Sequence, residues 1–175
     1  SSETKCLQSL ISEMRFKIAI VTASDKGAAG LRSDESKLVI ERMTKSLGEI
    51  SEYHLLPDDR AELADKLRAI CDSRAADVIF TTGGTGLSPR DVTPEATLDV
   101  AERLVPGMAE AMRAYSMRIT PNAMLSRAVC AIRASTLIVN LPGSPKAVQE
   151  CLEAVLPAIR HGLDSLKGNV IDCAR

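Results

Sequence analysis

The sequence contains one loop whose composition suits phosphate binding. Residues 82–86 read Thr-Gly-Gly-Thr-Gly, and Ser88, Arg90 and Asp91 follow them. The glycines let the backbone adopt positive φ angles and turn consecutive N–H groups toward an anion. The loop matches neither the GxxxxGK[ST] nor the GxGxxG pattern. The alternative is that the glycines only permit a tight turn from a strand into a helix, but the flanking hydroxyl groups favour phosphate.

Two aspartates are candidate metal ligands beside this loop. Asp91 lies where its carboxylate would face the bound phosphates, and two negative groups tolerate each other only through a cation. Mg²⁺ is the natural ion, because one or two carboxylates and substrate phosphates usually hold it. Asp58, just past a predicted strand, is the second candidate ligand. The alternative for Asp58 and Asp59 is a helix N-cap followed by an acidic first turn.

Two other loops are rich in small, polar or ionisable residues. Ser24-Asp25-Lys26 follows the first predicted strand. Gly143-Ser144-Pro145 begins the last predicted helix with free N–H groups, and Lys146 offers a positive charge. The alternative there is a well-capped helix with a solvated lysine. The pair Ser126-Arg127 has no local feature that raises it above an ordinary polar loop.

The elements that position these loops follow from the apolar pattern. Short β-branched and apolar runs predict strands over residues 16–22, 50–56 and 77–81. Two later runs, 128–133 and 136–139, are separated by two residues and predict a hairpin. Strands and helices alternate, so we expect an α/β fold of three layers, with a mostly parallel sheet, helices on both faces and one antiparallel strand pair. Ligands bind at the carboxyl ends of such strands, so the loops should share one site.

Apolar residues at three- and four-residue spacing predict the helices. Ser33 or Asp34 can cap the first, whose apolar face extends to Leu47. The next helix follows residues 57–59. The helix after the glycine-rich loop begins near Thr93, which is a cap candidate.

Prolines mark the remaining helix boundaries and one distortion. Pro94 suits the first helical position. Pro106-Gly107 interrupts that helix before another, Met108 to Tyr115. The last helix continues to Leu166, and Pro157 should kink it.

Composition bounds the class of protein. The 175 residues, with 22 Lys and Arg against 23 Asp and Glu, suit one domain over residues 15–175 after a tail of residues 1–14. Without a basic surface, and with only two Phe and two Tyr, nucleic acid is not an expected partner. Apolar stretches reach only about seven residues, whereas a membrane span needs roughly 20, so we expect a cytoplasmic protein. The five cysteines are scattered and indicate reduced thiols in or near the core.

Residues 81–97 resemble the signature of the molybdenum cofactor biosynthesis proteins of the Mog type, a family that includes the N-terminal domain of gephyrin. Residues 20–26, 56–59, 125–127 and 137–146 agree with the same family, and the resemblance covers about residues 15 to 168. One departure lies after Asp34-Glu35-Ser36, where many relatives carry a glycine and this chain carries Lys37. The departure leaves the role of Asp34 open.

The resemblance implies a trimeric α/β protein that adenylylates molybdopterin. The terminal phosphate of molybdopterin would attack the α-phosphorus of Mg·ATP and release pyrophosphate. The resemblance gives Asp58 and Asp91 catalytic roles in holding Mg²⁺ and positioning the nucleotide, and it links Ser126 and Asn140 to pterin or nucleotide binding. The complete set of predicted substrate-binding residues is Asp25, Thr82, Gly83, Gly84, Thr85, Gly86, Ser88, Arg90, Ser126, Asn140, Pro142, Gly143, Ser144 and Lys146.

A molybdate-insertion enzyme is a candidate partner on the same basis. Two alternatives stay open: a paralogue that binds molybdopterin without adenylylating it, and a trimeric scaffold. Retention of both Asp58 and Asp91 argues against the scaffold, which would not need them.

Overall fold

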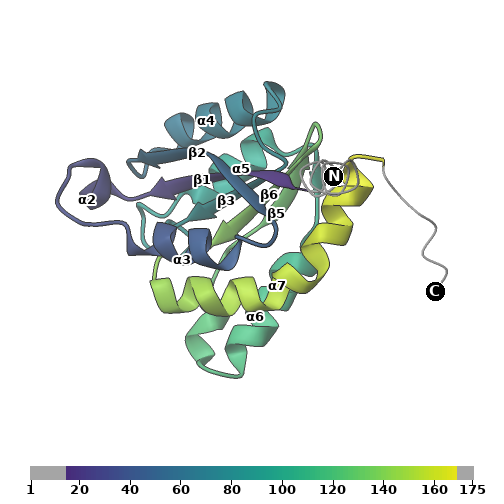
Figure 1. The fold of residues 1–175 in the computed structure, drawn as a ribbon. Coiled ribbons are helices and arrows are strands. Elements are labelled where there is room, and N and C mark those ends of the chain that lie inside the picture. Colours follow the sequence, from purple (N-terminus) through teal and green to yellow (C-terminus); the bar gives the residue numbers. More distant parts are fainter. Residues whose placement is uncertain (1–14, 169–175) are drawn as a thin grey trace, which may run out of the picture.

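Six strands form one sheet in the order β2-β1-β3-β6-β5-β4 (Figure 1). The computed structural model describes residues 15–168, so the predicted tail, residues 1–14, lies outside the described residues. Strands β2, β1, β3 and β6 run parallel, and β5 runs antiparallel beside β6 as the predicted hairpin. The strands are β1 (Phe16–Ala23), β2 (Gly48–Leu56), β3 (Val78–Thr82), β4 (Arg103–Leu104), β5 (Cys130–Arg133) and β6 (Thr136–Leu141).

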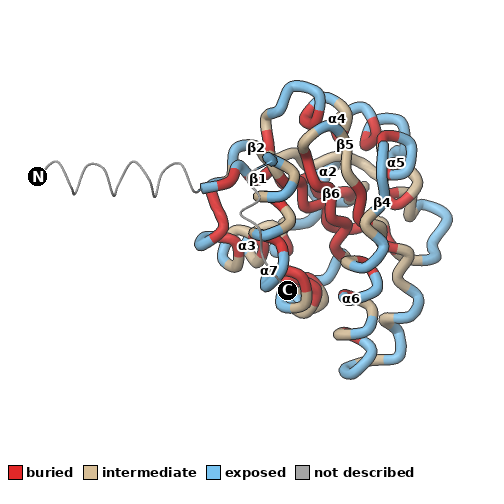
Figure 2. The backbone as a smooth tube through the Cα atoms, turned by 90° about the vertical axis from the view of Figure 1, so that its right-hand side faces the viewer, coloured by how far each residue is buried: buried red, intermediate tan, exposed pale blue. Residues whose placement is uncertain are grey.

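Helices cover both faces of this sheet, so the predicted three-layer α/β fold is confirmed. Helices α4 and α5 pack on one face, and α3, α6 and α7 pack on the other (Figure 1). A hydrophobic core lies on each face of the sheet, and alternate residues of β1 point into one or the other. Ile20 lies in the cluster that includes Leu152 of α7, and Val21 lies in the cluster that includes Leu67 of α4. The central strands β1, β3 and β6 are almost entirely buried, whereas the edge strands β2 and β4 are mostly intermediate or exposed (Figure 2). The helices are α2 (Asp25–Ala28), α3 (Glu35–Met43), α4 (Arg60–Asp72), α5 (Thr93–Val100), α6 (Pro106–Met117), the 3-10 helix η1 (Pro121–Leu125) and α7 (Pro145–Leu166).

Asp34, rather than Ser33, caps α3, because its carboxylate accepts a hydrogen bond from the Lys37 N–H at 3.1 Å. The helix is shorter than its apolar pattern predicts. It ends at Met43, and Leu47 is buried in the turn that leads into β2. The pattern is misleading there because a buried turn residue and a buried helix residue are both apolar.

The prediction that Thr93 caps α5 is wrong. Val92 is the cap residue and makes no side-chain capping bond. Thr93 lies within the first turn, where its N–H donates to the Gly84 carbonyl at 3.1 Å and its side chain is buried against the glycine-rich loop. The threonine therefore packs the helix onto the loop instead of satisfying the helix's own N–H groups.

The segment before Pro106 is also not helical throughout. Helix α5 ends at Val100, and residues Arg103–Leu104 form β4, which pairs antiparallel with β5 at the sheet edge. Two exposed residues give too short a pattern to predict such a strand from the sequence. Helix α7 is continuous from residue 145 to 166 with Pro157 inside it, and it changes direction along its length in Figure 1.

Three cysteines, Cys71, Cys130 and Cys151, are free and buried, as expected, whereas Cys6 and Cys173 lie outside the described residues. Burial raises the pKa of all three thiols to about 11 or 12, so they stay protonated at neutral pH. Within residues 15–168, no helix has the length and apolar character that crossing a bilayer requires.

Candidate active site

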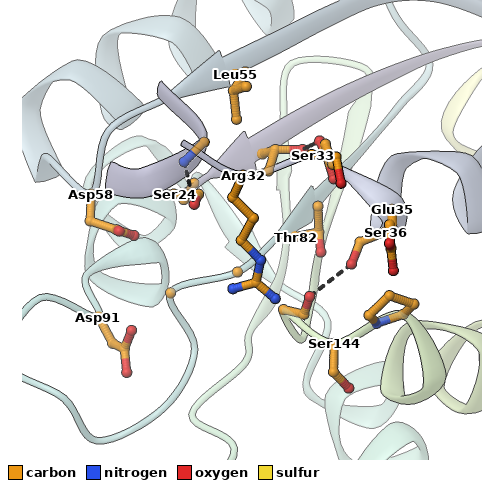
Figure 3. Close-up of a pocket in the computed structure, with 18 residues that line it drawn as sticks. Ser24, Arg32, Ser33, Glu35, Ser36, Leu55, Asp58, Thr82, Asp91 and Ser144 are labelled. Carbon is orange, nitrogen blue, oxygen red and sulfur yellow. Dashed lines mark hydrogen bonds between the residues drawn. The ribbon is translucent and has the colours of Figure 1, made fainter. Parts of the chain in front are cut away.

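A cavity of about 510 Å³ opens where the carboxyl ends of the parallel strands meet (Figure 3). All four loops predicted to form a site contribute residues to it. Ser24 follows β1, Asp58 follows β2, Gly83 and Gly84 follow β3, and Ser144 follows β6. The start of α3 closes another side. The full lining is Thr22, Ala23, Ser24, Gly27, Arg32, Ser33, Asp34, Glu35, Ser36, Leu55, Asp58, Thr82, Gly83, Gly84, Asp91, Gly143, Ser144 and Pro145.

The glycine-rich loop has the left-handed backbone that its sequence predicts. Gly83 has φ +93° and Gly84 has φ +69°. A Cβ at Gly83 would collide with the Ala23 carbonyl, and one at Gly84 would collide with the Thr93 hydroxyl. Within residues 15–168, the N–H groups of residues 84–87 have no hydrogen-bond partner, so they can receive an anion.

Asp58 is free to act as a ligand because its neighbour performs the capping. Asp59 caps α4, and its carboxylate accepts from the Glu62 N–H at 2.8 Å. The Asp58 side chain instead lines the cavity, where its Oδ2 accepts from the Asp25 N–H at 3.1 Å. The capping alternative therefore applies to Asp59 and not to Asp58.

Asp91 lines the same cavity from the other end of the glycine-rich loop (Figure 3). Its Oδ2 accepts from the Ser88 N–H at 3.0 Å. Among the described residues, Oδ1 of Asp58 and Oδ1 of Asp91 accept no hydrogen bond. Each carboxylate thus keeps one oxygen available to a ligand.

The electrostatics of the site separate Asp58 from its neighbour Asp25. Burial, together with the negative charges of Asp25 and Asp91, raises the pKa of Asp58, although the Asp25 N–H opposes the shift. Asp25 has a lowered pKa, first because Arg90 donates two hydrogen bonds to it, at 3.0 and 2.9 Å. Negative charge on Asp58 is therefore poorly compensated, which suits a site that receives a cation.

The residues present fit a magnesium ion better than a metal that needs a complete protein cage. Residues 15–168 contain no group of three or more His, Cys, Asp or Glu side chains arranged to hold a metal. Asp58 and Asp91 alone supply two carboxylates in one cavity. Mg²⁺ commonly takes its remaining ligands from water and substrate phosphates, so two carboxylates suffice.

Arg127 fixes the shape of the glycine-rich loop. Its guanidinium donates to the Gly86 carbonyl at 2.8 Å and the Asp91 carbonyl at 2.7 Å, and it pairs with Glu95 at the start of α5. Its own N–H donates to the Thr85 carbonyl at 2.9 Å. The sequence gives no local signal for this role, because the partners are more than thirty residues away.

A second network, also without a local sequence signal, fixes the α3 side of the cavity. Oδ2 of Asp34 accepts from the Thr22 hydroxyl at 2.5 Å and from the Tyr53 hydroxyl at 2.6 Å. The Ser36 hydroxyl donates to the Gly143 carbonyl at 2.7 Å. Asp34 therefore ties α3 to β1 and β2. Burial and Asp34 together raise the pKa of Tyr53 to about 12, so this hydroxyl stays a donor.

Lys37, the residue that departs from the family pattern, does not line the cavity. Its Nζ lies 4.3 Å from the centre of the Tyr53 ring and 3.2 Å from Oε1 of Glu41. The departure is accommodated outside the cavity, and the Asp34 cap is retained.

A second cavity of about 260 Å³ lies on the other side of the glycine-rich loop, and its lining is mainly apolar. Thr85 and Gly86 line this cavity, whereas Gly83 and Gly84 line the first. The β6–α7 loop is divided in the same way. The full lining is Thr85, Gly86, Ala109, Met112, Arg113, Ser116, Thr120, Asn122, Ala123, Leu125, Ser126, Ala128, Asn140, Pro142, Ala147, Glu150 and Cys151.

The predicted binding residues thus divide between two neighbouring cavities. Asn140 is fully buried, and its amide already donates to Thr81 and Thr97 and accepts from the Val129 N–H. Four predicted residues line neither cavity: Asp25, Ser88, Arg90 and Lys146. Of these, Asp25, Ser88 and Arg90 support the loops, through the contacts described above.

Comparison with known proteins identifies the family of this chain. The family model described as "probable molybdopterin binding domain" matches residues 19–161. A molybdopterin adenylyltransferase of Helicobacter pylori strain J99 is 42% identical over 155 residues, which cover 87% of this chain and 88% of that protein. The molybdopterin adenylyltransferase of Escherichia coli K12 is 40% identical over 155 residues, covering 85% and 80%.

A solved structure supports the same relationship. The molybdopterin biosynthesis enzyme MoaB of Thermus thermophilus superimposes with a TM-score of 0.83 at 47% identity, covering 87% of this chain and 97% of that one. The family model spans most of the described fold, and the residues that line both cavities lie within its match. The chain therefore belongs to the family of molybdopterin-binding proteins of molybdenum cofactor biosynthesis.

Proposed function

We propose that the protein is a molybdopterin adenylyltransferase that transfers AMP from Mg·ATP to the terminal phosphate of molybdopterin and releases pyrophosphate. One observation carries the proposal: a polar cavity with two available carboxylates and an apolar cavity share the same glycine-rich loop. The names of the relatives from H. pylori and E. coli support the same activity.

The polar cavity suits the triphosphate of ATP. The N–H groups of residues 84–87 can donate to phosphate oxygens, and Asp58 and Asp91 would hold Mg²⁺. The ion supplies positive charge that offsets the phosphates and the two carboxylates. Residues Thr82 and Ser144 add hydroxyl groups to the same lining.

The apolar cavity suits the pterin ring. Met112, Ala109 and Ala128 present carbon surface to a flat ring, and Ser126 lies at the same cavity. A pterin bound there would direct its phosphate toward the glycine-rich loop, because this loop is the shared wall. The nucleophile would then meet the α-phosphorus without either substrate crossing the loop.

The reaction needs no general base from the protein. A phosphate monoester is already ionised at neutral pH, so its oxygen can attack the α-phosphorus directly. The linings of both cavities contain no histidine among the described residues. Catalysis would depend on positioning and on charge neutralisation, as phosphoryl transfers generally do.

The quaternary structure and cellular setting are part of the same proposal. We expect a cytoplasmic homotrimer that could deliver its product to a molybdate-insertion enzyme. Four large apolar side chains in and around α6 and η1 are exposed, which favours self-association on this side: Met117, Ile119, Met124 and Leu125.

The direct test incubates the full chain with Mg·ATP and molybdopterin and follows both products. Adenylyl-molybdopterin and pyrophosphate should appear together in equal amounts, and chelation of Mg²⁺ should stop the reaction. A protein that binds molybdopterin tightly but forms neither product would favour the binding-only paralogue. A protein that binds neither substrate and still assembles as a trimer would favour the scaffold.

A further inference from the structure

The polar cavity contains one positively charged side chain among the described residues that line it. That residue is Arg32, in the segment between α2 and α3. The other charged lining residues are all acidic: Asp34, Glu35, Asp58 and Asp91. A cavity that receives a highly charged anion therefore has a single protein cation available to it.

The Arg32 guanidinium is not committed to another contact. In Figure 3 its side chain extends into the cavity, toward the space between the two aspartates and Ser144. Within residues 15–168 it has no hydrogen-bond or ion-pair partner. Arg90 and Arg127 differ in this respect, because Arg90 is held by the Asp25 carboxylate and Arg127 by the Glu95 carboxylate and by two carbonyl groups.

The backbone just before Arg32 is held in place. The Leu31 N–H donates to the Lys26 carbonyl at 2.8 Å, and the Gly30 N–H donates to the Gly27 carbonyl at 2.9 Å. On the other side, Asp34 is fixed by Thr22 and Tyr53. The backbone on both sides of Arg32 is thus held by hydrogen bonds, which favours a defined position of its side chain when an anion binds.

The two cavities indicate which phosphates Arg32 meets. Arg32 and Ser33 line only the polar cavity, whereas the glycine-rich loop borders both. Attack at phosphorus places the incoming and leaving oxygens roughly in line, on opposite sides. If the pterin phosphate arrives from the apolar cavity, the leaving group points away from that cavity, toward the α3 side.

We propose that Arg32 binds the β- and γ-phosphates of ATP and stabilises pyrophosphate as it leaves; this inference rests on the proposed function. An oxygen of the molybdopterin phosphate bonds to the α-phosphorus, and the bond from the α-phosphorus to the bridging oxygen breaks. The electron pair remains on that oxygen, so negative charge grows on the pyrophosphate. A guanidinium can donate two hydrogen bonds to such a group.

The test compares three ligands by titration calorimetry in the presence of Mg²⁺: ATP, pyrophosphate and AMP. Arg32→Gln should weaken ATP and pyrophosphate binding by roughly 10- to 100-fold, the usual effect of losing charged hydrogen bonds. Its affinity for AMP should match the wild type, because AMP lacks the β- and γ-phosphates. The affinities of Arg32→Lys for ATP and pyrophosphate should lie between those of the wild type and those of Arg32→Gln.

Arg42→Gln is the matched control, since Arg42 is an exposed α3 arginine that contacts Gln149 and does not line the cavity. It should bind all three ligands like the wild type. In turnover, Arg32→Gln should raise KM for ATP and also lower kcat, because charge on the leaving group grows in the transition state.

Two results would overturn the role of Arg32. The first is that Arg32→Gln loses affinity for AMP and ATP equally. The second is that Arg32→Gln binds both ATP and pyrophosphate as tightly as the wild type. Wild-type turnover is measured beside them to separate the two proposals. A wild type that adenylylates molybdopterin, with an unaffected Arg32 variant, removes only this inference. A wild type that neither binds ATP nor forms product removes both.

Discussion

The two cavities differ in chemistry although they share a wall. The cavity of about 510 Å³ is lined by aspartates, hydroxyl groups and glycine backbone, whereas the cavity of about 260 Å³ is lined mainly by carbon. The first is built from loops at the carboxyl ends of strands, and the second from α6, η1 and the start of α7. The two cavities therefore suit different parts of the substrates. The polar cavity suits charged phosphates, and the apolar cavity suits the pterin ring.

The physical origin of each cavity is visible in its residues. Loops at strand ends expose backbone N–H groups and tolerate polar side chains, so a charged site forms there. The lining of the second cavity includes four small side chains, and larger ones would fill part of its space: Ala109, Ala123, Ala128 and Ala147. The polar cavity thus depends on the hydrogen-bonding and charged groups of its loops, whereas the apolar cavity depends on the small size of its alanine side chains.

The largest effect is expected from Asp91→Asn, which removes charge from the polar cavity alone. Adenylylation should fall by roughly 100-fold or more, because a metal ligand supports the charge of the transition state. Molybdopterin binding should be retained, since the apolar cavity is unchanged. Product formation and equilibrium binding of molybdopterin measure the two effects separately.

Asp65→Asn is the control for that prediction, because Asp65 forms an exposed ion pair with Arg68 far along α4. It should turn over like the wild type. Normal turnover by Asp91→Asn would contradict the assignment of Asp91 as a magnesium ligand.

Arg127→Lys should disturb the wall that both cavities share. Lysine keeps the charge but cannot reproduce the forked contacts with Gly86, Asp91 and Glu95, so the loop should lose its fixed shape. We expect kcat to fall by roughly tenfold to 100-fold, as misplacement of reacting groups commonly does. Arg133→Lys is the matched control, since Arg133 makes a similar forked pair with Asp72 away from both cavities. Equal losses in the two variants would contradict a specific role for Arg127.

Ala147→Leu should affect the apolar cavity alone. The added carbon atoms occupy space at its lining, so molybdopterin affinity should fall by roughly tenfold, in keeping with about 1–3 kcal/mol for a misfitting methylene. ATP affinity should not change. Ala111→Leu places the same side chain on an exposed part of α6 and should alter neither affinity. A loss of ATP binding in Ala147→Leu would mean that the cavities are not separate.

The smallest effect concerns stability. The pKa of Asp58 is raised in the folded protein, so its charged form opposes folding at neutral pH. Asp58→Asn should therefore raise Tm slightly. The gain should be complete above the raised pKa and should disappear as the pH falls from that pKa to the ordinary aspartate value, because the carboxyl is then neutral in both the folded and the unfolded wild type.

Asp59→Asn is the control for that stability effect. Asparagine caps helices about as well as aspartate, so the Tm of this variant should match the wild type. A Tm that falls in Asp58→Asn at neutral pH would contradict the account of uncompensated charge.

The sequence predicts five of the six strands of the described sheet, its mostly parallel character and the loops of the polar cavity, because short apolar runs and glycines act locally. Glycine at positions 83 and 84 permits the positive φ angles that the structure shows. The roles of Arg127 and Arg32, and the contacts of Asp34 beyond its helix cap, could not be recognised in this way. The residues that Arg127 and Asp34 contact, and the residues that line the cavity beside Arg32, lie in distant parts of the chain. A single arginine in a sequence gives no repeating pattern from which its role could be predicted. The cap at Thr93 fails as a prediction because Val92 is the cap residue, and the Thr93 N–H donates to the Gly84 carbonyl of the preceding loop.

The division between the cavities can be tested most directly by a crystal structure of the protein with adenylyl-molybdopterin and Mg²⁺. The account predicts one molecule that spans both cavities, with the pterin beside Met112 and the phosphates at the glycine-rich loop. The metal should contact Asp58 and Asp91. A product that lies entirely within one cavity, or a metal held by other residues, would contradict it.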